Sequence, residues 1–265
     1  HLEHRRQRQM CIRDRFGIKG YAIEAHYAEY MLSLHESTVG SDIYEVEGKS
    51  VYKLKKECSG WNASEELLVF FKTKNNGQSK LESKWKTFET FSGEAYQFDL
   101  IDKINDERTN NFFGFANITS ENNNAKYFSD KEYTIPLETL IEFPITQLKN
   151  IILAAENNEK IYNSNIFMGS ELLDGHRVVS VIIGKQKKYK EKIFENKFYE
   201  KLYWPINLAY YNPEQESEKP EYRISAKLQK NGVLIEYIIF YDNFSIISKL
   251  SNIEQIDDSN CVDTN

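Results

Sequence analysis

Residues 222–242 read YRISAKLQKNGVLIEYIIFYD, two alternating runs rich in β-branched and aromatic residues on either side of Asn231-Gly232. An Asn-Gly pair between such runs is the strongest short-range signal for a β-hairpin. The next run, residues 244–256, is expected to pair with the second arm of this hairpin. The end of the chain is therefore predicted to be an antiparallel three-stranded sheet.

The same period of two dominates the chain from residue 23 onward, with Gly or Asn between the runs. This cadence is typical of a single antiparallel β-barrel or sandwich. Pro205 should restrict its run to a sheet edge or to the start of a strand, and a break is expected at Glu47-Gly48. The remaining predicted strands are residues 25–35, 42–54, 64–73, 83–90, 95–102, 110–119, 125–135, 160–168, 176–185 and 203–212.

One segment, residues 144–157, has a different period. Its sequence PITQLKNIILAAEN places apolar residues at i, i+3, i+4 and i+7 from Leu148, and Pro144 suits a first helical turn. We expect one amphipathic helix in an otherwise β protein. Residues 186–203 are strongly charged and fit either a short helix or a long loop.

The composition excludes several protein classes. Hydrophobic residues make up 40% and aromatic residues 14% of the 265 residues, with only 12 Gly and 5 Pro. These values exclude collagen-like and wholly disordered chains. No run approaches the roughly 18 apolar residues that a membrane helix needs.

The first residues look foreign to the rest of the chain. Residues 1–15, HLEHRRQRQMCIRDR, resemble a conceptual translation of a sequencing adaptor, and residues 16–22 are interpreted as the remnant of a leader or linker. The alternative is a basic arm that binds nucleic acid or anionic lipid. Removing five Arg, Glu3 and Asp14 from 34 basic and 40 acidic residues leaves 29 and 38, a net charge of −9 instead of −6. This charge is unfavourable for binding nucleic acid.

Without those residues two cysteines remain, Cys58 and Cys261. Neither has the spacing of a metal ligand, so zinc is not expected. A disulfide in an oxidising compartment and two unrelated cytosolic thiols both stay open. The polar sequence around Cys261, DDSNCVDTN, favours the disulfide, because a buried thiol does not suit such a tail. A disulfide implies export, and a signal peptide would then be missing from this sequence.

The search for catalytic motifs is negative. No GxSxG, HExxH, P-loop, GxGxxG after a strand or EF-hand pattern occurs, so no enzymatic activity and no cofactor are expected. His26, His35 and His176 are isolated histidines, for which a structural or exposed role is favoured. Glu65 and Glu66 are adjacent, so in a strand they point to opposite faces, and both are expected to be solvated.

A lysine cluster is a possible surface for an acidic partner or an anionic lipid head group. Glutamates interrupt the cluster, which favours an ordinary solvated face instead. The 17 Tyr and 16 Phe fit a concave sheet that holds lipid or peptide, although plain strand core is the favoured reading. The cluster comprises Lys185, Lys187, Lys188, Lys190 and Lys192.

Seven segments, in one colinear pass over residues 23–261, also carry a resemblance to a known family. They are AHYAEYMLSL (25–34), GKSVYKLKKECSGWN (48–62), SKWKTFETFSGEAYQFD (83–99), FPITQLKNIILAA (143–155), RVVSVIIGK (177–185), WPINLAYYN (204–212) and EYRISAKLQKNGVLIEYIIFYDNFSI (221–246). In this order the chain resembles the EipB-like cell-envelope integrity family of alphaproteobacteria. The interruption at Met31 and the charged insert at 186–203 depart from the family pattern.

The resemblance implies a single periplasmic domain, residues 23–261, followed by a tail at 262–265. Its implied fold is mainly β, a spiral-like broken β-barrel with one helix and a disulfide between Cys58 and Cys261. Its implied role is non-enzymatic maintenance of the cell envelope. We expect other envelope proteins as partners, since a broken barrel exposes strand edges and a concave face. The alternative is a carrier of lipid or lipoprotein.

Overall fold

The computed structural model describes residues 23–75, 77–119, 123–138, 140–173, 175–190, 198–199, 201–214 and 218–257. Over these residues the chain forms strands and one helix, α1 (Pro144–Glu156). The strands are β1 (His26–Ser37), β2 (Ile43–Lys56), β3 (Gly60–Thr73), β4 (Gln78–Thr90), β5 (Ala95–Ile104), β6 (Glu107–Ile118), β7 (Asn123–Phe128), β8 (Glu132–Pro136), β9 (Ile141–Glu142), β10 (Ile161–Ile166), β11 (Arg177–Ile183), β12 (Lys187–Lys188), β13 (Leu202–Tyr211), β14 (Tyr222–Leu228), β15 (Leu234–Phe240) and β16 (Phe244–Gln255).

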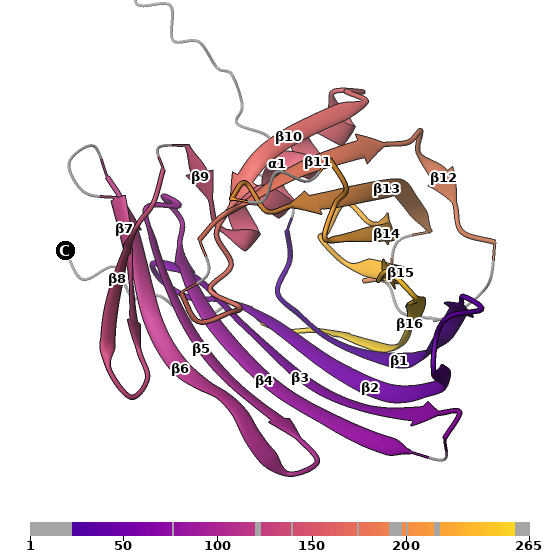
Figure 1. Cartoon of the computed structure of the whole chain (residues 1–265). Coiled ribbons are helices and arrows are strands. Elements are labelled where there is room, and N and C mark those ends of the chain that lie inside the picture. Colours follow the sequence, from indigo (N-terminus) through magenta and orange to yellow (C-terminus); the bar gives the residue numbers. More distant parts are fainter. Residues whose placement is uncertain are drawn as a thin grey trace, which may run out of the picture.

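The strands form one sheet that curls around a central space without closing (Figure 1). Its order is β8-β7-β6-β5-β4-β3-β2-β1-β16-β15-β14-β13-β11-β10-β9, and β12 pairs with β13 off this path. The two edge strands, β8 and β9, lie on the same side of the molecule, at the left of Figure 1. Over the described residues this arrangement is a broken β-barrel with one helix, as the family resemblance implied. Over the described residues no helix is long and apolar enough to cross a membrane.

The predicted terminal hairpin is confirmed, but its turn is wider than a two-residue Asn-Gly turn. The backbone N–H of Gly232 donates to the carbonyl of Gln229 (3.1 Å), and the N–H of Gln229 donates to the carbonyl of Val233 (2.8 Å). Gly232 has a φ of 90°, whereas Asn231 is not among the residues with positive φ. Such a turn is a three-residue loop that ends in a glycine with left-handed backbone.

Three predictions about the strands are wrong. Residues 125–135 form two strands, because the chain turns at Ser129–Lys131 between β7 and β8. β2 continues through Gly48, where a Cβ would lie 2.6 Å from the carbonyl oxygen of Leu68, so this glycine permits close packing on β3 instead of ending the strand. The sheet is also not wholly antiparallel, because β9 pairs in parallel with β10.

Other local predictions are confirmed. Pro205 lies near the start of β13, a strand that pairs with both β11 and β14. The helix buries Ile151, Ile152 and Ala155, as its amphipathic pattern predicted. The charged insert differs from both expectations, a short helix or a long loop, because the two-residue strand β12 pairs with the start of β13. Residues 191–197 and 200 lie outside the described part of the chain.

Part of the concave face of the sheet is filled by aromatic rings. Tyr96 and Phe98 of β5 point inward, and Phe143 and Phe167, at the start of α1 and just after β10, pack onto them. The ring centroids of Tyr96 and Phe143 are 4.9 Å apart, and those of Phe98 and Phe167 are 5.7 Å apart. These rings, with Phe112 and Tyr127, form the region that we call the filled half.

Candidate functional site: an apolar cavity with an inward-facing carboxyl

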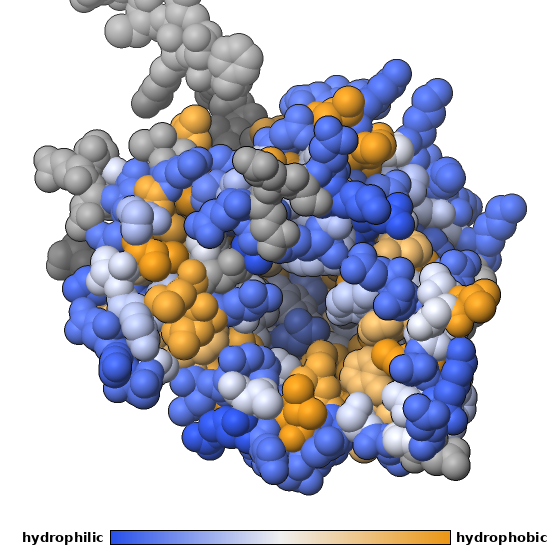
Figure 2. All heavy atoms as spheres, viewed as in Figure 1, coloured by the Kyte–Doolittle hydropathy of each residue, from blue (hydrophilic) through white to orange (hydrophobic). Residues whose placement is uncertain are grey.

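The other part of the concave face is not filled. A cavity of about 460 Å³ lies between the inner faces of β1–β4, the start of α1 and strands β14–β16. We call this region the hollow half. Its volume falls within the range of roughly 300–1,000 Å³ that is usual for small-molecule sites. Figure 2 shows a hollow in the middle of the molecule, with hydrophobic residues on part of its rim.

Strand β3 decides which side chains enter the cavity. Because side chains alternate along a strand, Glu65, Leu67, Val69 and Phe71 all line the cavity. Glu66 and Leu68 lie on the outer face and are exposed. The two glutamates therefore face opposite ways, as predicted, but the prediction that both are solvated is wrong for Glu65, which points into the barrel.

Glu65 occupies a row of directly paired residues that runs across the concave face. Tyr52 of β2 lies on one side of it and Trp85 of β4 on the other, and Leu100 of β5 follows Trp85. The Ser50 hydroxyl donates a hydrogen bond of 2.6 Å to Oε1 of Glu65. Burial raises the pKa of Glu65 above its ordinary value, against the opposing effect of the Ser50 hydrogen bond, so the uncharged carboxyl is favoured.

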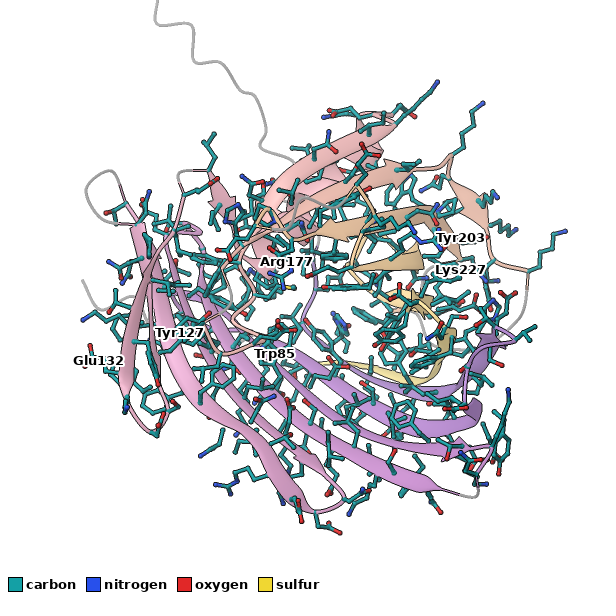
Figure 3. The ribbon with its side chains drawn as sticks, viewed as in Figure 1. Trp85, Tyr127, Glu132, Arg177, Tyr203 and Lys227 are labelled. Carbon is teal, nitrogen blue, oxygen red and sulfur yellow. The ribbon has the colours of Figure 1, made fainter. Side chains whose placement is uncertain are left out.

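Beyond Glu65 the space continues into a smaller hollow of about 190 Å³. Glu65 and Leu67 line both spaces, and Trp85, Leu100 and Asp102 complete much of the smaller one. The indole Nε1 of Trp85, which Figure 3 places at the inner side of the sheet, is buried and has no hydrogen-bond partner among the described residues. A buried donor without an acceptor is uncommon in folded proteins.

The other polar groups of the cavity are mainly phenols. Burial raises the pKa values of Tyr30, Tyr52 and Tyr237 above their ordinary values, so their hydroxyls stay protonated. His26 also lines the cavity, and burial lowers its pKa, so its ring is favoured in the neutral form. The His26 Nδ1 atom lies 2.8 Å from the carbonyl oxygen of Glu24, which fixes the ring.

The three histidines that the structure describes are not brought together. Of these, His26 alone lines the cavity; His176 lies 3.5 Å from Glu138, and His35 contacts its neighbour Glu36. Among the described residues no group of three or more His, Cys, Asp or Glu could hold a metal ion. The cavity can thus offer hydrogen-bond donors to a largely apolar ligand.

Helix α1 forms one wall of the cavity and is held by Glu89 of β4. The residue before the helix, Phe143, supplies no side-chain cap. Instead Glu89 Oε2 accepts from the N–H of Ile145 (2.7 Å), and Oε1 accepts from the N–H (2.7 Å) and hydroxyl (2.5 Å) of Thr146. A carboxylate at a helix N-terminus is electrostatically favourable. Pro144 and Ile145 are thereby placed against the cavity.

Sequence reasoning did not find the roles of Glu65 and Glu89. The segment around Glu89 was singled out only because it resembles a segment of the EipB-like family, and no role was assigned to Glu89 itself. The signal available for Glu89 was indirect, because a helix that begins at Pro144 without a preceding Ser, Thr, Asp or Asn needs a partner for its free N–H groups from elsewhere.

The predicted lysine surface lies away from the cavity. The four lysines that the structure describes are exposed, and none of them lines the cavity. Tyr189, within the cluster, packs on Tyr203, and the ammonium of Lys227 lies 5.0 Å from the centre of the Tyr189 ring. Figure 3 labels Tyr203 and Lys227 at the right of the molecule. The described lysines are Lys185, Lys187, Lys188 and Lys190, and Lys192 lies outside the described residues.

The structure describes one of the two cysteines of the predicted disulfide. Cys58 lies in the turn between β2 and β3, and Cys261 lies outside the described residues. The pairing stays a prediction.

Comparison with known proteins agrees with the fold and the order of segments. A cell envelope integrity protein, EipB, from Brucella abortus (strain 2308) is 27% identical over 236 residues, covering 88% of this chain and 84% of that protein. The crystal structure of a β-barrel-like protein of domain of unknown function DUF1849, also from Brucella abortus, superposes with a TM-score of 0.84 and 26% identity. It covers 89% of this chain and 100% of that chain. The sequence profile of EipB-like proteins matches residues 19–257, and the chain therefore belongs to the EipB-like family.

Proposed function

We propose that this protein supports the integrity of the cell envelope from the periplasm, and that it acts by binding other envelope proteins without catalysing a reaction. The observation that carries the proposal is the similarity to the cell envelope integrity protein EipB over 88% of the chain. The family profile matches residues 19–257, which include the whole curled sheet and so both faces on which a partner could bind.

The open sheet offers a way to bind proteins. Because β8 and β9 end the sheet, backbone groups on their outer sides have no neighbouring strand in the described sheet. An extended peptide can add to such an edge. Both edges are short, and Pro136 in β8 lacks an N–H, features that limit unspecific pairing. A specific partner would therefore need contacts beyond the edge itself.

The test is genetic and biochemical. A strain that lacks the gene should become sensitive to detergent and to cell-wall antibiotics, and the complete gene should restore resistance. Crosslinking in intact cells, followed by purification of the tagged protein, should recover the same envelope proteins from independent cultures. Unchanged resistance of the deletion strain would refute the envelope role. Reproducible rescue without any crosslinked protein would refute the mode of action.

The periplasmic location can be tested through the predicted disulfide. Thiol labelling of denatured cell extract should modify Cys58 and Cys261 only after reduction, because both would be paired in an oxidising compartment. Labelling of both cysteines without reductant would contradict the disulfide and the argument for export that depends on it.

The cavity favours a second candidate function, a carrier of lipid or lipoprotein. Its lining is mainly apolar and it is open to ligands of small-molecule size. Native mass spectrometry of the protein purified from membranes separates the two candidates. A retained lipid favours the carrier, and a complex with an envelope protein but no lipid favours protein binding.

A further inference from the structure

We propose that the cavity binds one acyl chain, with the hydrocarbon along Leu67, Val69 and Phe71 and the chain's uncharged carbonyl group at Glu65. This inference deepens the carrier form of the proposed function, because it names the class of ligand and the residues that recognise it. The fold places these four residues in register on the inner face of β3, so that an extended chain could follow the strand.

The wall of the cavity matches a hydrocarbon chain. The side chains of Leu32, Leu81, Leu148, Ile224 and Ile246 face the β3 residues around the cavity. Each methylene removed from water between such side chains strengthens binding about fourfold. A chain of several methylenes therefore gains affinity without any polar contact.

The surroundings of Glu65 suit the polar end of the ligand. Around Glu65 the structure gathers hydrogen-bond donors: the Trp85 Nε1 atom, which has no acceptor, and the protonated hydroxyl groups of Tyr52 and Tyr237. A cluster of donors suits a ligand group that only accepts, such as the carbonyl of an ester or amide. The same Nε1 atom would gain the partner that it lacks among the described residues.

The lining of the two spaces disfavours a negatively charged ligand. Neither the cavity nor the smaller hollow is lined by a Lys or Arg among the described residues, and the smaller hollow contains Asp102. An ionised fatty acid would lose its hydration there without a cation to compensate. An acyl chain in ester or amide linkage carries no charge and avoids this cost.

A peptide is a poorer occupant of the same space. Each of its residues brings an N–H and a C=O that need partners once they leave water. The long wall formed by Leu67, Val69 and Phe71 offers no polar side chain to satisfy them. An acyl chain needs polar contacts at its carbonyl end only, and the row of Tyr52, Glu65 and Trp85 across the sheet offers them there.

The donor role of Glu65 makes binding depend on pH. Burial favours its protonated form, which can donate to a carbonyl, whereas the ionised form cannot. Raising the pH should therefore weaken binding of an uncharged ester. Several polar groups share the lining of the cavity or of the smaller hollow with Glu65, or contact it. They are His26 and Tyr30 of β1, Ser50 and Tyr52 of β2, Ser83 and Trp85 of β4, Asp102 of β5, Ser170, Tyr237 of β15, and Tyr241 just after β15.

The experiment uses the purified protein after removal of bound lipid, with methyl decanoate as the probe and isothermal titration calorimetry as the readout. We expect saturable binding of one ester per chain. Leu67→Trp, which fills the cavity, should weaken binding at least tenfold, whereas Leu68→Trp on the outer face of the same strand should leave it unchanged. Leu67→Phe gives a milder filling if the tryptophan variant does not fold.

A second pair of variants tests the carbonyl contact. Glu65→Gln keeps an N–H donor that does not titrate, so its affinity should be the same at about pH 5 and about pH 8. The unmodified protein and Glu66→Gln should both lose affinity over this range. Equal pH dependence in all three proteins would refute the contact with Glu65.

A comparison of decanoate with its methyl ester tests whether the site takes free or esterified acyl chains. Decanoate at neutral pH should bind at least tenfold more weakly than its methyl ester, which assigns the site to esterified chains. Tighter binding of decanoate than of the ester, or no saturable binding of the ester, would overturn the proposal. Because these measurements use purified protein, failure of the envelope phenotype would refute the proposed function alone.

Discussion

The filled and hollow halves lie on one concave face, and both are lined by aromatic residues, yet they pack differently. In the filled half, Phe143 and Phe167 reach the sheet from outside it and cover the rings of β5. In the hollow half, no described segment covers the inner face of the sheet in this way. Helix α1 only lines the cavity, through Pro144, Ile145 and Leu148. Aromatic side chains on the concave face therefore do not by themselves distinguish a core from a binding site. The difference is whether another part of the chain covers those side chains.

The largest expected effect is in the filled half. Phe98→Ala should lower the free energy of unfolding by about 3–5 kcal/mol, since it leaves a cavity among packed rings. Phe71→Ala in the hollow half should cost about 1–2 kcal/mol, because Phe71 is half-buried and already faces open space. Urea unfolding measures both. Equal losses would show that the two halves do not differ in packing.

The next largest loss of stability is expected at Glu89, which holds the start of α1 between the two halves. Glu89→Ala should lower the free energy of unfolding by about 1–3 kcal/mol, because it removes the acceptor of the Ile145 and Thr146 N–H groups. Both halves should loosen together, since Phe143, directly before α1, lies in the filled half and Leu148 of α1 lines the hollow half.

Glu94→Gln is the control for this variant, because Glu94 is an exposed glutamate just beyond the same strand. Its effect on unfolding should stay within about 0.5 kcal/mol. Hydrogen exchange of the α1 amides reports the loosening directly, and unchanged exchange in Glu89→Ala would contradict the capping role.

A smaller effect is expected from the titration of Glu65. Because its pKa in the folded protein is raised, the folded state holds a proton that the unfolded state has released. Its contribution to stability is therefore present below the ordinary pKa of a glutamate and declines as the pH rises through the raised value. Between about pH 5 and about pH 8, Glu65→Gln should lose less stability than the unmodified protein. Urea unfolding at the two pH values checks the sign, and a steeper loss in the variant would show it to be wrong.

The smallest effect is expected on the outside of the barrel. The double variant Lys187→Glu, Lys188→Glu changes two exposed residues on the short strand β12 and should alter the free energy of unfolding by no more than about 0.5 kcal/mol. If these lysines contact an acidic partner, crosslinking in cells should decrease while ester binding stays the same. A change in ester binding would mean that the lysines influence the hollow half, which their position does not predict.

Much of this comparison could not be predicted from the sequence. The period of two located most strands and the terminal hairpin, and the i, i+3, i+4, i+7 pattern located the helix, because these elements depend on local patterns. The same pattern fails in β3, since Leu67, Val69 and Phe71 on one face are matched by Leu68 and Phe70 on the other. Because both faces of β3 carry apolar residues, the sequence pattern does not show which face becomes the concave one. The direction in which Glu65 points therefore follows only from the curl of the sheet.

Contacts between distant segments were also beyond the reach of local patterns. The pairing of β9 with β10 involves two residues and a parallel register, and Glu89 meets α1 from 56 positions away. Nothing in a short window of sequence reports such a contact. The missing side-chain cap before Pro144 shows only that some partner is needed.

The position of β1 beside β16 has a consequence for how the molecule assembles. These neighbours lie in the middle of the sheet, and the Ser251 hydroxyl donates to the carbonyl of Glu29, 222 positions earlier. The strands from β2 to β8 can pair each with the next as the chain emerges, whereas the centre of the sheet has to wait for β16. Pairings of such long range form slowly. The inner strand β1 therefore keeps one side unpaired until β16 has been made, although β1 ends up in the middle of the finished sheet.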